Sequence, residues 1–334
     1  MLNADVAVDR RDFTVRAAFD VADGERVALF GPSGAGKTTV LEVIAGLVAP
    51  RAGLVELGGR TLTRTDPPTV AVPPWERRVG LLRQDPGLFP HLSVRANLTY
   101  ARSSRAGRSA QATAAELAEL AASLGIEGLL GAMPARLSGG QRHRVALGRL
   151  LLARCDALLL DEPFASLDAV LRRSLTALVK FLSSERSVPS VLVTHQLSDA
   201  QAFADRLLVM DAGAIVQAGG PDEVVLRPAS RRVAELVGYL GFVPAPGAPG
   251  TVAGVHPDRV LAGAEPERGP VVTAAVTAAR PSGAGWEADL VVGDAPFTGR
   301  LPSRLDGAEV SVTLLDPPYY GPDGALVERA SRAR

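Results

Sequence analysis

The apolar residues of this chain fall into short runs with two different spacings. Residues 12–21 alternate polar and apolar positions, and residues 26–30 form a short apolar run, so both segments are predicted to be β-strands. Residues 38–48 place apolar side chains at helical spacing instead. A strand that passes through a glycine-rich loop into a helix is therefore expected over residues 26–48.

Strands and helices continue to alternate up to about residue 220. Residues 109–124 are rich in Ala, Leu and Glu and predict a helix, and Ser138 can cap another helix that ends near residue 153. Further apolar strands are expected at residues 79–82, 157–160, 190–194, 207–211 and 214–217. This alternation predicts an α/β core.

The pattern changes after residue 238. Residues 239–250 include the Pro- and Gly-rich sequence PAPGAPG and are predicted to be a linker. The remaining segment, 251–334, carries short β-like runs at 271–279, 286–292 and 308–315, separated by Gly and Pro turns. We expect it to form a small β-barrel of the OB type.

The composition argues against nucleic-acid binding, an internal disulfide and a membrane-spanning segment. The 334 residues are 47% hydrophobic and carry 36 basic and 36 acidic side chains, which gives no overall field to attract nucleic acid. The single cysteine, Cys155, excludes an internal disulfide. Charged residues interrupt the longest apolar region, 145–160, and the N-terminus lacks an apolar signal segment, so any membrane-spanning part is expected on another chain.

The glycine-rich loop carries the first chemical signal. It matches the pattern GxxxxGK[ST] with the residues Gly31, Pro32, Ser33, Gly34, Ala35, Gly36, Lys37, Thr38 and Thr39. Backbone N–H groups and the helix N-terminus in such a loop cradle phosphate, Lys37 is expected to reach the β- and γ-phosphates, and Thr38 is expected to ligate Mg²⁺. Lysine is scarce here, since Lys180 is the only other one, which supports a functional role for Lys37.

Two further motifs follow in order. Asp161 and Glu162 come directly after the apolar strand 157–160, and an aspartate there suits a second contact to Mg²⁺. Residues 137–141 read Leu-Ser-Gly-Gly-Gln and precede a basic helix with apolar periodicity. This sequence resembles the signature of the ATP-binding cassette (ABC) family, a class of P-loop ATPases.

The resemblance implies a role for each matching residue. Glu162 corresponds to the general base, His195 to the switch histidine at the γ-phosphate, and Gln84 to the glutamine that approaches Mg²⁺ and the attacking water. Asp168 corresponds to the loop that crosses the dimer interface. The signature residues Ser138, Gly139, Gly140 and Gln141 would close over ATP bound to the partner chain. A homodimer that hydrolyses ATP with Mg²⁺ is therefore expected.

The residue that stacks on adenine is not evident from the sequence. Counting backward from the second strand places the family's aromatic position near Val8, which is not aromatic. Phe13 lies close by, but we expect it to be a core phenylalanine in preference to a base-stacking one.

The resemblance covers nearly the whole chain and points to importers. Residues 1–238 resemble a complete nucleotide-binding domain, with a helical subdomain at about 85–153, and residues 251–334 resemble the regulatory TOBE domain. The segments 77–80, 84–85 and 88–94 look most like molybdate-import ATPases, with sulfate, iron(III) and polyamine importers as alternatives. Such a protein would lie peripherally on the cytoplasmic face of the membrane, with two permease subunits and, indirectly, an extracytoplasmic solute-binding protein.

The sequence also allows another class of ABC ATPase and more than one role for the C-terminal segment. A soluble ABC ATPase of translation or DNA repair would carry two cassettes or long coiled coils, and the sequence shows neither. The tail could bind a regulatory oxyanion or could only stabilise a dimer; its few aromatic residues and neutral charge argue against nucleic-acid binding.

Overall fold

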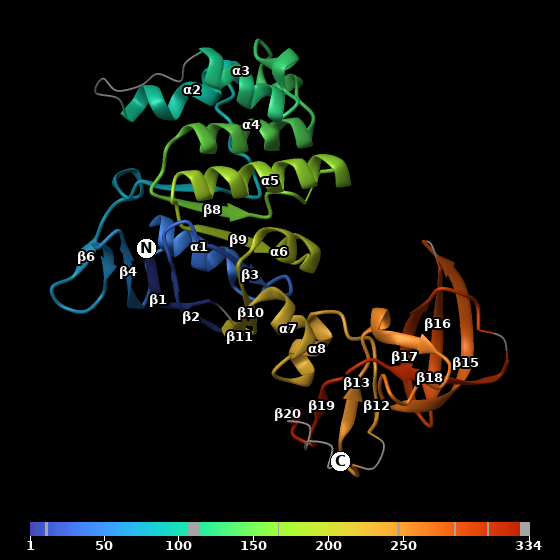
Figure 1. Ribbon diagram of the computed structural model, residues 1–334. Helices are drawn as coiled ribbons and strands as arrows, with labels where there is room; N and C mark the ends of the chain where they lie inside the picture. The colour runs from blue at the N-terminus through green and yellow to red at the C-terminus, as the bar shows by residue number, and fades with distance from the viewer. Residues whose placement is uncertain are drawn as a thin grey trace. The chain divides into compact units, whose positions relative to one another are not determined.

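The computed structural model describes residues 1–10, 13–105, 114–165, 167–245, 248–283, 285–305 and 307–327. The chain forms two compact units, residues 1–221 and residues 222–334 (Figure 1). Each unit has its own sheets and its own buried apolar core, so each is described by itself.

The first unit is built on a sheet of 11 strands in the order β6-β5-β4-β1-β2-β11-β10-β3-β9-β8-β7. Its strands are β1 (Leu2–Asp9), β2 (Thr14–Val21), β3 (Arg26–Phe30), β4 (Ala52–Leu57), β5 (Arg60–Arg64), β6 (Val70–Ala71), β7 (Val79–Leu82), β8 (Ala157–Asp161), β9 (Ser190–Thr194), β10 (Arg206–Asp211) and β11 (Ala214–Gly219). The five strands β10, β3, β9, β8 and β7 pair in parallel, and β1 pairs antiparallel with β2 and β4.

The burial of these strands explains their sequences. Every residue of β8 and β9 is buried, because helices cover both faces of the parallel part of the sheet (Figure 1). In contrast, β1 and β2 alternate buried and more exposed positions, as expected for strands with one buried face. The predicted α/β fold of this part of the chain is confirmed, although the sequence pattern did not identify β1 as a strand.

Helices connect these strands (Figure 1). They are α1 (Lys37–Ala45), α2 (Val94–Arg105), α3 (Ala114–Ser123), α4 (Gly139–Leu152), α5 (Ala169–Glu185) and α6 (Leu197–Phe203), with short 3₁₀ turns at Pro74–Glu76, Glu127–Leu129 and Pro134–Arg136. Of the helix expected at 109–124, residues 109–113 lie outside the described residues, and α3 covers 114–123. In the part of the chain that the structure describes, no helix is long and apolar enough to cross a bilayer.

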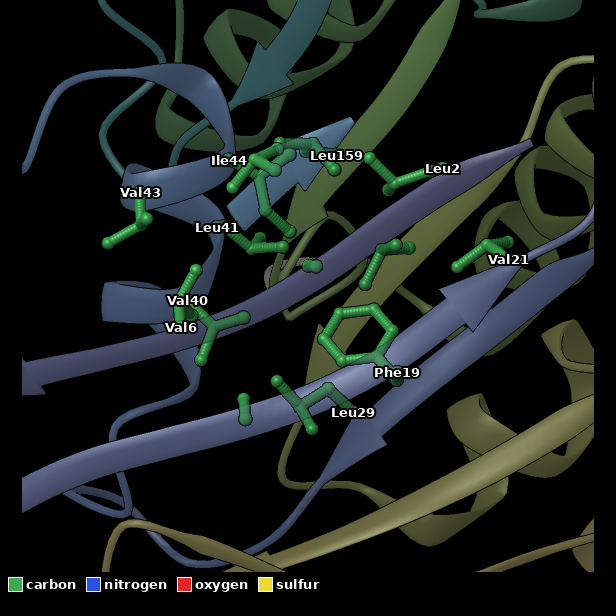
Figure 2. Packing of buried hydrophobic residues seen from close by; sticks show 14 of the residues in the cluster. Leu2, Val6, Phe19, Val21, Leu29, Val40, Leu41, Val43, Ile44 and Leu159 are labelled. Atoms are coloured by element: carbon green, nitrogen blue, oxygen red, sulfur yellow. The ribbon is translucent and has the colours of Figure 1, made fainter. Parts of the chain in front are cut away.

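Helix α1 packs its apolar side chains onto the sheet. Figure 2 shows Val40 of α1 next to Val6 of β1, and Ile44 of α1 near Leu159 of β8, and all four side chains are buried. The helix ends at Ala45, earlier than the expected residue 48, because Gly46 adopts a left-handed conformation with φ 81° and caps it. This packing fixes the position of the loop that leads into the helix.

Arg77 closes the C-terminal end of α1. Its side chain is buried, and Nη1 donates to the carbonyls of Val43 and Ile44, both at 3.0 Å. Nε donates to the carbonyl of Val72 at 2.8 Å, and Nη2 donates to Thr63 Oγ1 at 2.9 Å. The cation is favourable there because the last carbonyls of a helix carry partial negative charge, although burial lowers the pKa of Arg77.

The second unit is rich in β-structure. Its elements are α7 (Pro221–Leu226), α8 (Arg231–Leu236), β12 (Phe242–Pro244), β13 (Val252–Gly254), a 3₁₀ turn (Pro257–Arg259), β14 (Val260–Ala262), β15 (Val271–Ser282), β16 (Gly285–Val292), β17 (Ala295–Leu301), β18 (Glu309–Leu314), β19 (Tyr319–Tyr320) and β20 (Leu326–Val327). Five strands form the order β14-β18-β15-β16-β17, and four form the order β12-β13-β19-β20. The two end strands of the larger sheet approach each other, since a Cβ at Gly299 of β17 would lie 3.1 Å from Val260 of β14. The sheet therefore curls toward a barrel, in agreement with the predicted OB-type fold.

The division between the units differs from the expected boundary at residue 238. Residues 222–238 join the second unit, because Tyr320 donates to the carbonyl of Pro228 at 3.3 Å and Arg231 N–H donates to the carbonyl of Gly324 at 2.8 Å. The expected linker 239–250 is also partly structured. Tyr239 is buried and β12 pairs with β13, so the Pro- and Gly-rich composition did not mark an extended spacer there.

Candidate nucleotide-binding site

A cleft of about 500 Å³ lies where the glycine-rich loop and the carboxyl ends of β8 and β9 meet. Its lining comprises Arg10, Phe13, Ser33, Gly34, Gly36, Lys37, Thr38, Thr39, Gln84, Glu162, Val193 and His195. The carboxyl ends of parallel strands are the usual place for a ligand in an open α/β sheet. The fold thus brings together residues that are far apart in the sequence.

The glycine-rich loop turns through two left-handed glycines before α1. Gly34 has φ 82° and Gly36 has φ 101°, a region that side chains rarely adopt. A Cβ at Gly36 would lie 2.6 Å from Cγ2 of Val15, so space also requires glycine there. Among the described residues, no side chain caps the N-terminus of α1, and its first turn contains no acidic residue. Its first N–H groups are therefore available to an anion such as phosphate.

Lys37 lies beneath this loop. Its Nζ donates to the carbonyls of Gly31 and Pro32, both at 2.8 Å, and its side chain is almost fully buried. Burial lowers the pKa of Lys37, whereas the nearby carboxylates of Glu162 and Asp161 raise it. The ammonium is held at the floor of the cleft, where phosphate oxygens can replace loop carbonyls as its acceptors.

Thr38 and Asp161 form a pair of oxygen ligands. Thr38 Oγ1 lies 3.0 Å from Oδ2 and 3.2 Å from Oδ1 of Asp161. Burial raises the pKa of Asp161, and the hydrogen bond from Thr38 opposes this effect. Mg²⁺ prefers hard oxygen ligands and binds through one or two carboxylates together with substrate phosphates, so this pair fits the ion. The described residues contain no group of three or more His, Cys, Asp or Glu side chains that could hold a metal ion.

Glu162 and His195 meet at the mouth of the cleft. Glu162 Oε1 lies 2.8 Å from Nδ1 of His195, and Glu162 has a left-handed backbone with φ 48°. A non-glycine residue in this region is strained, and such strain is frequent at functional positions. The backbone therefore holds the carboxylate of Glu162 beside the phosphate loop in a conformation that packing has to maintain.

Gln84 also lines the cleft, and so do Arg10 and Phe13. The expectation that Phe13 is a core residue is wrong: it directly precedes β2, its side chain is 36% exposed, and it lines the cleft together with the glycine-rich loop. Arg10 directly follows β1, and nothing in the sequence marked it as a site residue. Their place in the cleft follows from the pairing of β1 with β2, for which the sequence carries no motif.

The signature residues lie outside this cleft. Ser138 is the N-cap of α4: its hydroxyl accepts from Gln141 N–H at 3.2 Å, and Gln141 Oε1 accepts from Ser138 N–H at 2.8 Å. Asp168 caps α5 in a similar way, with Oδ1 3.0 Å from the N–H groups of Val170 and Leu171. These backbone hydrogen bonds lower the pKa of Asp168. Gly139 and Gly140 form the first turn of α4 and are not among the residues of the cleft.

Comparisons with known proteins agree with this geometry. A family model described as ABC transporter matches residues 15–165. The sulfate/thiosulfate import ATP-binding protein CysA 2 of Chromobacterium violaceum is 42% identical over 233 residues, which cover 69% of this chain and 60% of that protein. The molybdenum import ATP-binding protein ModC of Mycobacterium tuberculosis is 41% identical over 257 residues, which cover 75% of this chain and 69% of that protein.

A solved structure shares the fold of the first unit. The dimeric ATP-binding cassette MJ0796, in a post-hydrolysis state bound to ADP and Pi, superimposes with a TM-score of 0.57 at 25% identity. The match covers 66% of this chain and 99% of that chain. Together with the identity to the two import proteins, these similarities show that the chain belongs to the ABC transporter family.

Proposed function

We propose that this chain is the ATP-hydrolysing subunit of an ABC importer and works as a homodimer with Mg²⁺. The observation that carries the proposal is the grouping of Lys37, Thr38, Asp161 and Glu162 around one loop whose helix N-terminus is left open. Relatives named as import ATP-binding proteins support the class of activity.

Each residue has a distinct part in the proposed reaction. The α1 N–H groups and Lys37 bind and orient the β- and γ-phosphates. Thr38 and Asp161 would hold Mg²⁺, which neutralises charge on the phosphate oxygens when it is bound. Glu162 accepts a proton from the attacking water, and His195, 2.8 Å from it, orients that carboxylate and faces the γ-phosphate. Gln84 lies at the edge of the cleft, where it would contact the water and the ion.

The signature residues belong to the partner's site in this proposal. Within the described part of the chain, the N–H groups of Gly139 and Gly140 have no acceptor, and the hydroxyl of Ser138 can still donate while it accepts from Gln141. These donors suit the γ-phosphate of ATP bound to a second copy. Asp168, at the N-cap of α5, would cross the interface. The dimeric state of the MJ0796 cassette supports such an assembly.

A glutamine at position 162 tests the reaction and the dimer together. Glu162→Gln removes the proton acceptor but keeps the shape of the side chain, so turnover should fall by about 10²–10⁴-fold while ATP still binds. The variant should then accumulate as an ATP-bound dimer, measured by light scattering after size-exclusion chromatography. The exposed Glu185→Gln serves as control. Ordinary turnover in Glu162→Gln would overturn the base assignment, and a monomer at saturating ATP would overturn the homodimer.

We further propose that the transported solute is an oxyanion, with molybdate preferred, and that two permease subunits at the cytoplasmic face of the membrane receive the ATPase. An extracytoplasmic binding protein would select the cargo. Relatives named for molybdenum import and for sulfate import support the oxyanion class. The likeness of residues 77–80, 84–85 and 88–94 to molybdate-import ATPases is the ground for preferring molybdate. The second unit would act as the TOBE-like regulatory or dimer-stabilising domain. ATPase activity of the reconstituted complex with molybdate-loaded or sulfate-loaded binding protein distinguishes the two cargoes.

A further inference from the structure

The turn between β1 and β2 holds Arg10 and Phe13 at one edge of the cleft. The two strands pair up to Asp9 and Thr14, whose side chains are also hydrogen-bonded, with Thr14 Oγ1 2.9 Å from Asp9 Oδ1. Arg10 N–H donates to the carbonyl of Phe13 at 2.8 Å, which closes the turn. The register of the hairpin therefore fixes a guanidinium and an aromatic ring side by side in the lining of the cleft.

The guanidinium of Arg10 is held against the first turn of α1. Its Nη2 lies 2.7 Å and its Nε 3.0 Å from Oγ1 of Thr39, the last residue of the phosphate-binding motif. Glu42, one turn further along α1, lies 3.5 Å from Nη2 and also contacts Arg83 at 3.4 Å. One carboxylate is thus shared between two arginines, and Arg83 precedes Gln84 in the chain.

This cation lies beside the first turn of α1. A helix N-terminus carries partial positive charge and attracts anions, so a guanidinium beside it is repelled. Lys37 adds a second positive charge to the lining of the cleft. The shared carboxylate of Glu42 offsets only part of this charge. An anion with several oxygens, bound between the guanidinium and the first N–H groups of α1, would remove the repulsion.

We propose that Arg10 binds the α-phosphate of the nucleotide. This inference rests on the proposed ATP-binding function. Lys37 and the Thr38–Asp161 pair account for the β- and γ-phosphates, whereas Arg10 lies with Thr39 and Phe13 on the side of the cleft toward the hairpin. The α-phosphate is not altered by hydrolysis, so Arg10 contributes to binding equally in the ground state and the transition state. Thr39 and Glu42 act as positioning residues for the guanidinium.

Substitution of Arg10 should change nucleotide affinity and leave the rate of hydrolysis nearly unaltered. Loss of a charge-assisted hydrogen bond in Arg10→Gln should weaken binding of ADP and AMP about tenfold and raise KM for ATP similarly, with kcat within about twofold. Arg10→Lys should recover part of the affinity, because the charge remains but the planar fork does not. Binding is measured by calorimetry for ADP and by competition for AMP, and turnover by phosphate release.

A matched control is an arginine that contacts the same hairpin from outside it. Arg51 pairs with Asp9 at 3.4 Å and is not among the cleft residues, so Arg51→Gln removes a comparable surface ion pair and should leave nucleotide affinity unchanged. Unaltered ADP affinity in Arg10→Gln would overturn the inference, as would a lower melting temperature of the nucleotide-free protein without a change in affinity. Weaker ADP binding with unchanged AMP binding would overturn the assignment to the α-phosphate. Failure of the wild-type chain to bind ADP would instead overturn the proposed function.

Discussion

Helices α1 and α4 both begin at glycine-containing motifs, but their N-termini are prepared in opposite ways. At α1 the N-cap is Gly36, and within the described residues no side chain accepts its first N–H groups. At α4 the N-cap is Ser138, which forms a reciprocal pair of hydrogen bonds with Gln141. One helix keeps its donors for a ligand, and the other uses part of them for its own stability.

The two helix N-termini are therefore stabilised by different interactions. The capping box stabilises the start of α4 by about 1 kcal/mol without any ligand. The start of α1 lacks this contribution and is held by packing of its buried face and by Arg77 at its other end. One chain alone therefore provides the groups at α1 that bind phosphate. In contrast, α4 has only a few free donors, which can contact a nucleotide that is bound to another chain.

The largest expected effect compares the two helix starts directly. Lys37→Ala should weaken ATP binding about 100-fold, because it removes a charge-assisted contact at the open helix end. Ser138→Ala should leave the affinity of the isolated chain within about twofold, lower its stability by about 1 kcal/mol, and reduce turnover at least about tenfold. Calorimetry and steady-state hydrolysis measure these effects. Equal losses of ATP affinity in both variants would mean that α4 contributes to the site of its own chain, and would contradict the difference between the two helices.

The next effect concerns the opposite end of α1. Arg77→Met should lower the free energy of unfolding by about 3 kcal/mol, since it leaves several buried carbonyls without a donor. The neighbouring Arg78 is mostly exposed and pairs with Asp156, so Arg78→Met should cost less than about 1 kcal/mol. Urea unfolding of the two variants gives the comparison. Similar losses at both positions would show that the C-terminal cap does not stabilise α1.

The smallest effect is a gain in stability at the metal-ligand pair. Asp161→Asn should raise the melting temperature of the nucleotide-free protein by about 2–4 °C at pH 7, corresponding to about 1 kcal/mol. Burial raises the pKa of Asp161 in the fold, so ionisation of this side chain destabilises the protein as the pH rises through that pKa. The difference between the wild type and the variant should disappear below about pH 4, the pKa of an unperturbed aspartate.

Thermal melts of the wild type and Asp161→Asn from pH 4 to pH 8 test the direction of this pH dependence. An equal melting temperature at pH 7, or a difference that does not vary with pH, would contradict the role of the buried charge. Added Mg²⁺ and ADP should stabilise the wild type more than the variant, because the variant loses a carboxylate ligand. This result would show that the charged Asp161 destabilises the free protein and that bound Mg²⁺ and ADP offset this loss of stability.

The sequence predicted the elements whose local pattern and tertiary role agree. The buried strands β8 and β9 are continuous apolar runs, and Ser138 followed by Gln141 is a complete capping signal, so both appeared where expected. The α/β fold and the barrel-like second unit followed from the same patterns. The boundary at residue 238 and the linker 239–250 did not, because residues 222–238 are held by strands near the end of the chain, a contact that no local composition records.

The sequence by itself determined the phosphate loop, the Asp161–Glu162 pair and the signature, because these motifs are contiguous and their chemistry depends on residue type. Only the tertiary structure decided which of them share one cleft. It brought Thr38 to Asp161 and Glu162 to His195 across parallel strands, and it left Ser138 outside. It also placed Arg10 and Phe13 in the cleft through the register of one hairpin, which depends on pairing between strands and therefore leaves no motif in the sequence.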